Sequence, residues 1–135
     1  MNTPTILLAD DEAHITCVVA QKLRSSGFQV VVARDGQEAY ELACRAAPAL
    51  VITDLQMPRM SGLDLALKLR ETPSTSQLPV LMLTARGYIL DPAVLAKTNI
   101  RQVVGKPFSA RDLVKRVFET LGMPAPVAGI TAEAA

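Results

Sequence analysis

Short apolar runs alternate with amphipathic segments along most of the chain. The runs 5–9, 28–33, 49–53, 80–83 and 103–105 have the length and the apolar character of strands buried on both faces of a sheet. Between these runs, apolar residues recur at the spacing of an amphipathic helix. This alternation is typical of βα units, which build a parallel sheet. We therefore predict one α/β domain.

Five helices are predicted, and most of their starts carry a capping signal. Asp35, Ser61, Asp91 and Ser109 stand where an N-cap side chain accepts a hydrogen bond from the helix backbone. The first helix should span about 13–26 and end at a glycine. The residues expected to face the core are Ile15, Val18, Val19 and Leu23, then Ala39, Leu42, Ala43 and Ala46, then Leu63, Ala66 and Leu67, and finally Leu113, Val114, Val117, Phe118 and Leu121.

Length and composition fit a single globular unit. The predicted elements occupy residues 1–122 of the 135-residue chain, and residues 123–135, rich in Ala and Pro, are predicted to be a disordered tail or the stub of a linker. The formal net charge is only +1, so we expect no direct binding to nucleic acid. Because no apolar stretch approaches the ~20 residues that span a bilayer, we also expect no membrane insertion.

The cysteines and the N-terminus bear on the compartment. Cys17 and Cys44 lie in predicted helices without metal-ligand spacing, and we expect both to be buried free thiols. Free thiols suit a reducing compartment, and the first residues do not form a signal peptide. We therefore expect a cytoplasmic protein.

Polar side chains stand where four of the predicted strands end. Asp10 and Asp11 follow the first run, Asp54 follows the third, Thr84 follows the fourth and Lys106 follows the last. Ligands of open α/β sheets bind outside the carboxyl ends of the strands. Taken singly, these residues have ordinary interpretations, such as Asp11 or Glu12 capping a helix, but together they predict a functional crevice.

The three aspartates of this crevice favour a metal ion. Carboxylates this close together raise one another's pKa unless a cation joins them. An all-oxygen site suits a hard ion such as Mg²⁺, whereas Zn²⁺ is disfavoured because no Cys or His lies near these positions. We therefore expect Mg²⁺ as the cofactor.

These motifs, taken in order, resemble those of the receiver domains of two-component response regulators. The resemblance rests on Asp10-Asp11, on Asp54-x-x-Met-Pro-x-x-x-Gly62, on Thr84-Ala and on Lys106-Pro-Phe. Intervals of 43, 30 and 22 residues separate Asp11, Asp54, Thr84 and Lys106. The resemblance covers residues 5–122. It implies a CheY-like, flavodoxin-like fold: a doubly wound three-layer sandwich of five βα units with parallel strand order 2-1-3-4-5.

The resemblance also implies roles for these residues. Asp54 resembles the phosphoacceptor, a carboxylate that takes a phosphoryl group from the phosphohistidine of a sensor histidine kinase or histidine phosphotransfer protein. Asp11 resembles a direct Mg²⁺ ligand and Asp10 a partly water-mediated one, with Asp54 and the backbone carbonyl of Gln56 completing the set. Thr84 and Lys106 would bind the phosphoryl oxygens. Pro107 matches a cis-proline position of the family.

One position departs from the family pattern. Receivers usually carry Tyr or Phe three residues before the lysine, where this chain has Val103, whose short side chain cannot make the same rotation. Tyr88 and Phe108 remain possible substitutes for that aromatic residue. The sequence thus supports the phosphorylation chemistry better than the usual output switch.

The leading interpretation is a free-standing receiver that signals by binding an unknown downstream protein when phosphorylated. It would be no enzyme beyond catalysing its own phosphorylation and dephosphorylation. The alternative is the receiver half of a longer regulator with a DNA-binding or enzymatic output domain. A dehalogenase-type phosphatase would need an acid where Gln56 stands, and a degenerate scaffold is disfavoured by the full set of acids, Thr84 and Lys106.

Overall fold

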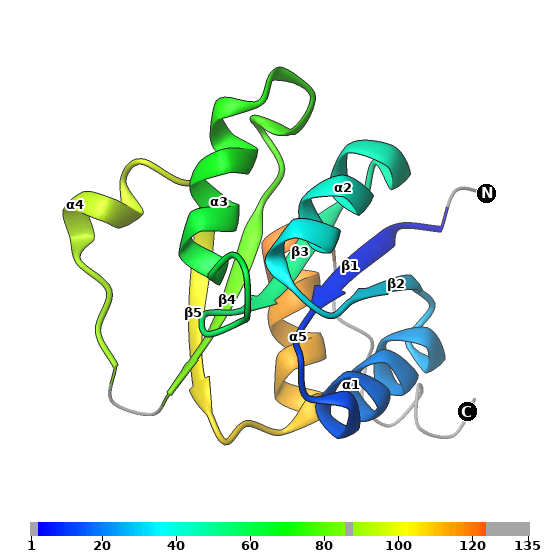
Figure 1. The fold of residues 1–135 in the computed structure, drawn as a ribbon. Helices are drawn as coiled ribbons and strands as arrows, with labels where there is room; N and C mark the ends of the chain where they lie inside the picture. The colour runs from blue at the N-terminus through cyan, green and yellow to red at the C-terminus, as the bar shows by residue number, and fades with distance from the viewer. Residues whose placement is uncertain (1–2, 86–87, 124–135) are drawn as a thin grey trace.

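The computed structural model describes residues 3–85 and 88–123 of the chain. Its five strands are β1 (Thr5–Ala9), β2 (Gln29–Ala33), β3 (Leu50–Asp54), β4 (Val80–Ala85) and β5 (Ile100–Lys106). They form one parallel sheet in the order β2-β1-β3-β4-β5 (Figure 1). Both the predicted parallel sheet and the strand order implied by the family are confirmed.

Helices cover both faces of this sheet. They are α1 (Ala13–Ser25), α2 (Gly36–Ala46), α3 (Gly62–Glu71), α4 (Pro92–Leu95) and α5 (Ala110–Leu121), with a 3₁₀ turn at Pro73–Thr75. Residues of α1 and α5 share one apolar core with the sheet, and residues of α2 and α3 share another on the opposite face. The three-layer sandwich is therefore confirmed.

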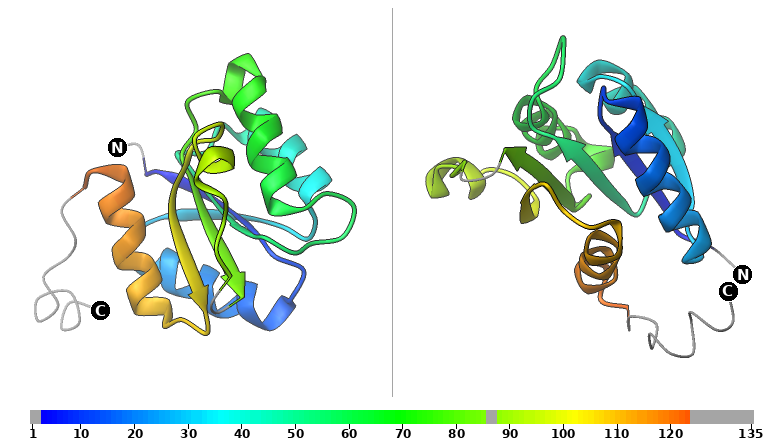
Figure 2. Two further views of the ribbon diagram at one scale, coloured as in Figure 1. Left: turned by 90° about the vertical axis from the view of Figure 1, so that its left-hand side faces the viewer. Right: turned by 90° about the horizontal axis from the view of Figure 1, so that it is seen from below.

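The helix α4 is the exception, since it has only four residues and stands away from the sheet (Figures 1 and 2). Leu95 packs at the margin of a small apolar cluster formed by Leu55, Met82 and Leu90. On β5, Val103 keeps 36% of its surface exposed. The edge strand β5 is thus less covered than the inner strands β3 and β4.

All four predicted N-caps are confirmed. The side chains of Asp35, Ser61, Asp91 and Ser109 each accept a backbone hydrogen bond of 2.8–3.1 Å from the first turn of their helix. At its other end, α5 stops at Gly122, which has a left-handed φ of 70°. These signals are local in the sequence, which explains why the sequence predicts them well.

Several predicted core positions were wrong. Val18 is 58% exposed because α1 turns Thr16, Val19, Ala20 and Leu23 inward instead. In α3 the buried positions are Leu65, Ala66 and Leu69, one step around the helix from the predicted set, so Leu63 and Leu67 are only partly buried. Ala46, at the end of α2, is exposed.

The prediction that both cysteines are buried was also wrong. Cys17 and Cys44 are free, as expected, but both are exposed, because each lies on the outer side of its helix. Apart from Met123, the predicted tail at 123–135 lies outside the described residues. Among the helices of the described part, none is long and apolar enough to cross a membrane.

Candidate functional site

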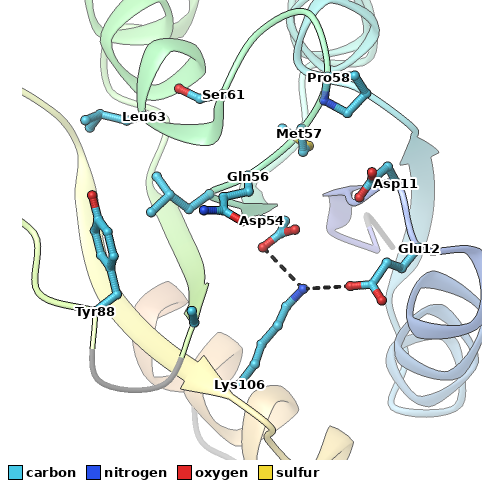
Figure 3. Close-up of a pocket in the computed structure, with 12 residues that line it drawn as sticks. Asp11, Glu12, Asp54, Gln56, Met57, Pro58, Ser61, Leu63, Tyr88 and Lys106 are labelled. Carbon is cyan, nitrogen blue, oxygen red and sulfur yellow. Dashed lines mark hydrogen bonds and ion pairs between the residues drawn. The ribbon is translucent and has the colours of Figure 1, made fainter.

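The carboxyl ends of β1, β3, β4 and β5 bring the predicted site residues to one edge of the sheet. Asp10 directly follows β1, Asp54 ends β3, and Lys106 ends β5. Thr84, near the end of β4, is buried and pairs in register with Gly105. A cavity of about 840 Å³ opens at this edge, and Asp54, Gln56 and Lys106 line it (Figure 3).

The ammonium group of Lys106 lies among three carboxylates. Its Nζ is 3.2 Å from Asp54 Oδ1, 3.4 Å from Asp10 Oδ2 and 3.2 Å from Glu12 Oε1. Figure 3 draws the contacts to Asp54 and Glu12 as dashed lines converging on the nitrogen. The contacts to Asp10 and Glu12 are hydrogen bonds, and the contact to Asp54 is an ion pair.

Burial and charge shift the pKa values of this cluster. Burial, with the neighbouring carboxylate of Asp10 as a second cause, raises the pKa of Asp54 above its ordinary value, although Lys106 opposes the shift. Burial alone would lower the pKa of Lys106, but the carboxylates of Asp10 and Asp54 outweigh it and raise that pKa. The site therefore holds an ammonium ion beside a carboxylate that is costly to ionise.

Three carboxylates are close enough to share one metal ion. Within the described residues, Asp10, Glu12 and Asp54 each offer an oxygen, and these oxygens lie within 4.8 Å of one another. Such an all-oxygen donor set fits Mg²⁺. Asp11, predicted as a direct ligand, is exposed and lies on the cavity wall outside this group (Figure 3). The exposed residue Gln56 lines the same cavity.

Glu12 is the residue that the sequence analysis missed as a member of the site. The sequence suggested it only as a possible helix cap. Glu12 does occupy the N-cap position of α1, but its side chain makes no capping hydrogen bond and instead reaches Lys106. The only sequence signal is its place directly after the acidic pair, because Lys106 lies 94 residues away along the chain.

The loop between β3 and α3 forms one wall of the cavity and is held at two points. At its end, the Gly62 amide donates to the Leu55 carbonyl at 2.8 Å. A Cβ on Gly62 would lie 2.2 Å from the Asp54 carbonyl oxygen, so a side chain there does not fit. In its middle, Arg59, at a φ of 69°, forms a 2.7 Å ion pair with Asp35. These contacts fix the backbone beside Asp54.

The remaining candidates lie around the site. The Lys106-Pro107 peptide is cis, as the family pattern implied. Tyr88 is half exposed and lines the Asp54 cavity, whereas Phe108 packs against the α1–α5 core. His14 is exposed and borders a second groove between α1 and the segment after β5. The roles of phosphoacceptor, metal ligand and phosphoryl-binding residue stay predictions for the residues to which the family resemblance assigned them.

Comparisons with known proteins agree with this architecture. Residues 6–118 match the response regulator receiver domain family. The chain is 38% identical over 112 residues to the transcriptional regulatory protein CpxR of Escherichia coli, covering 83% of this chain and 47% of CpxR. It is 38% identical over 120 residues to the sensor histidine kinase TmoS of Ectopseudomonas mendocina, covering 89% of this chain and 12% of TmoS.

A solved structure shows the same likeness over nearly its whole length. The response regulator receiver domain protein of Clostridium thermocellum is 30% identical, with a TM-score of 0.77, covering 88% of this chain and 94% of that one. The chain spans less than half the length of CpxR and a small part of TmoS. The fold, the order of the motifs and these matches show that the chain belongs to the receiver domain family of response regulators.

Proposed function

We propose that this receiver accepts a phosphoryl group on Asp54 in a Mg²⁺-dependent reaction, from the phosphohistidine of a sensor kinase or phosphotransfer protein. The observation that carries the proposal is the Asp54 carboxylate. It lies on an open cavity with Lys106 3.2 Å away and the buried Asp10 close by. A nucleophile, a fixed cation and further metal-binding oxygens are the parts that phosphoryl transfer requires.

In the transfer, an oxygen of the Asp54 carboxylate attacks the phosphorus of the donor. The P–N bond to the imidazole breaks, its electron pair returns to the ring nitrogen, and an acyl phosphate forms on Asp54. Lys106 offsets negative charge on the phosphoryl oxygens, and the Thr84 hydroxyl donates a hydrogen bond to one of them. Since phosphorylation changes the charge at Asp54 from −1 to roughly −2, fixed positive charge is essential at this position.

A Mg²⁺ ion would be held by Asp10, Asp11, Asp54 and the Gln56 carbonyl. Bound there, it would neutralise charge on the transferring group. The donor chemistry supports this assignment, because oxygen ligands and several carboxylates suit a hard divalent ion. The protein catalyses no reaction other than its own phosphorylation and dephosphorylation in this proposal.

The output is a protein–protein interaction that depends on phosphorylation, with an unidentified downstream target in the cytoplasm. A second candidate is the receiver part of a longer regulator. It is favoured by the relatives, since CpxR is about twice as long as the matched segment and TmoS longer still. A reading frame that continues into a DNA-binding or catalytic domain would decide for this second candidate.

The test is phosphorylation by acetyl phosphate with Mg²⁺, followed by intact-mass measurement. Wild type should gain one phosphoryl group, and Asp54→Ala should gain essentially none. Asp64→Ala is the control, because Asp64 is an exposed acid of α3 outside the cavity. Equal incorporation in Asp54→Ala, mapped to another residue, would contradict the proposal.

A further inference from the structure

Glu12 makes a contact that the proposed chemistry does not use. Its Oε1 accepts a hydrogen bond from Lys106 Nζ at 3.2 Å, beside the contact of the same nitrogen to Asp54 (Figure 3). Of the three carboxylates around Lys106, its side chain is the most exposed, at 46% against 10% for Asp54 and 0% for Asp10. The contact to Glu12 is therefore the one that solvent can most readily replace.

The backbone of Glu12 is held in place on both sides. Its N–H donates to Asp10 Oδ1 at 2.9 Å, and its carbonyl accepts from the amides of Ile15 and Thr16 at 3.1 Å. The side chain leaves this fixed N-cap position toward Lys106 instead of capping α1. The start of α1 thus places a carboxylate at a defined point beside the lysine.

From this geometry we propose that Glu12 is a positioning residue, which holds Lys106 in the unphosphorylated chain and releases it when Asp54 is phosphorylated. The proposal rests on the function proposed above. Lys106 donates hydrogen bonds to Asp10 and Glu12 and forms an ion pair with Asp54. The phosphoryl group formed on Asp54 carries more negative charge than the carboxylate it replaces, so it attracts Lys106 more strongly, and a movement of Lys106 toward it competes with the hydrogen bond to Glu12.

If Glu12 competes with the phosphoryl group for Lys106, the sign of the effect on the phosphorylation rate can be predicted. Removing the charge of Glu12 should make Lys106 more available to the phosphoryl group and should speed phosphorylation. The Glu12→Gln variant keeps the side-chain length but loses the ion pair. We expect its rate with acetyl phosphate, at saturating Mg²⁺, to rise about two- to fivefold, the size expected for a partly exposed ion pair.

Comparison of wild type with four variants separates this role from a general charge effect. Glu119→Gln, on the exposed surface of α5, removes the same charge far from the cavity and should match wild type. Lys106→Gln tests dependence on the lysine: if Glu12 acts through Lys106, adding Glu12→Gln to Lys106→Gln should change the rate little. An undiminished acceleration in the double variant would overturn the proposal.

A second readout needs neither phosphorylation nor metal. In metal-free protein, the side-chain ¹⁵N signal of Lys106 should shift, and its ammonium protons should exchange faster, in Glu12→Gln than in wild type or Glu119→Gln. Unchanged signals would show that Glu12 does not hold the lysine. A loss of Mg²⁺ affinity of about tenfold or more in Glu12→Gln would make Glu12 a metal ligand and would also contradict the proposal.

These outcomes also separate the two proposals. If wild type fails to accept a phosphoryl group on Asp54, the proposed function fails, whatever the lysine spectra show. If wild type is phosphorylated but Glu12→Gln neither reacts faster nor alters the Lys106 signals, only the role of Glu12 is wrong.

Discussion

The substitution Gly62→Ala tests how closely the backbone beside Asp54 is packed. An added Cβ would lie 2.2 Å from the Asp54 carbonyl oxygen and 3.0 Å from Met82 Sδ. Ordinary contacts of a Cβ begin near 3.4 Å, so the first of these distances must grow by 1.2 Å. Because the neighbouring atom belongs to the backbone, a change of side-chain rotamer cannot relieve this overlap. Either β3 or the start of α3 must move.

The expected cost follows from this displacement. Overpacking in a closely packed site typically costs ~1–3 kcal/mol, and a backbone neighbour places Gly62→Ala in the upper part of that range. The higher helix propensity of alanine offsets part of the loss. We expect the free energy of unfolding to fall by about 2 kcal/mol, which lowers the melting temperature by roughly 8 °C for a domain of this size.

The displacement should also slow the phosphorylation of Asp54. A shift of about 1 Å at a reacting group can lower a rate on the order of 10²-fold. The assay combines urea unfolding with the rate of phosphorylation by acetyl phosphate. Gly122→Ala is the matched control, because Gly122 has a left-handed φ of 70° but open space around it. It should lose ~1 kcal/mol of stability and keep the wild-type rate.

Two results would refute this reasoning. If Gly62→Ala were as stable as wild type, the β3–α3 loop would be able to move aside without a loss of unfolding free energy. A destabilised Gly62→Ala that is phosphorylated at the wild-type rate would mean that the β3–α3 loop does not position the Asp54 carboxylate.

Three further predictions concern charge, metal and signal propagation. Because the pKa of Asp54 is raised above its ordinary 3.8, its ionised form disfavours folding, so metal-free Asp54→Asn should be more stable than wild type at neutral pH. As the pH falls through the raised pKa toward 3.8, wild type should regain stability and the difference between the two proteins should disappear. A difference in unfolding free energy that stays constant with pH in urea titrations would contradict the assignment. Mg²⁺ should raise the melting temperature of wild type more than that of Asp11→Asn, and equal shifts would show that the ion binds elsewhere. Beryllofluoride should shift amide resonances strongly in 56–62 and 85–90 but weakly in 102–114, and comparable shifts in all three segments would show that the switch survives without its aromatic residue.

The sequence predicts the sheet and the helix starts because both depend on local signals. A run of apolar residues marks each of β1 to β4, whereas β5 begins three residues before the predicted run. A side chain at the start of α2, α3, α4 and α5 supplies the cap. The convergence of Asp54 and Lys106 could also be predicted, because the carboxyl ends of parallel strands share one edge of the sheet.

The rotation of each helix about its axis could not be predicted with the same accuracy. Leucines alternate along α3 at positions 63, 65, 67 and 69, so its apolar pattern allows more than one inward face. Leu65 and Leu69 are the ones that join the core cluster formed with residues of α2 and the sheet. Val18 is exposed for the same reason. Glu12 was missed because its partner, Lys106, is distant in the sequence and meets it only after folding.

The packing around Asp54 indicates which surface can change its conformation when this residue is phosphorylated. The β3–α3 loop is anchored by Gly62 at its end and by the Arg59–Asp35 ion pair in its middle. Between Asp54 and these anchors, Gln56 and Pro58 are exposed on the cavity wall. A ligand can shift a conformational equilibrium only through contacts that differ between the two states. Gln56 and Pro58 lie close to Asp54, where contacts can differ between the two states, whereas the short side chain of Val103 offers few contacts that depend on its rotamer. A downstream partner should therefore recognise the wall formed by Gln56 and Pro58 more than the surface around Val103.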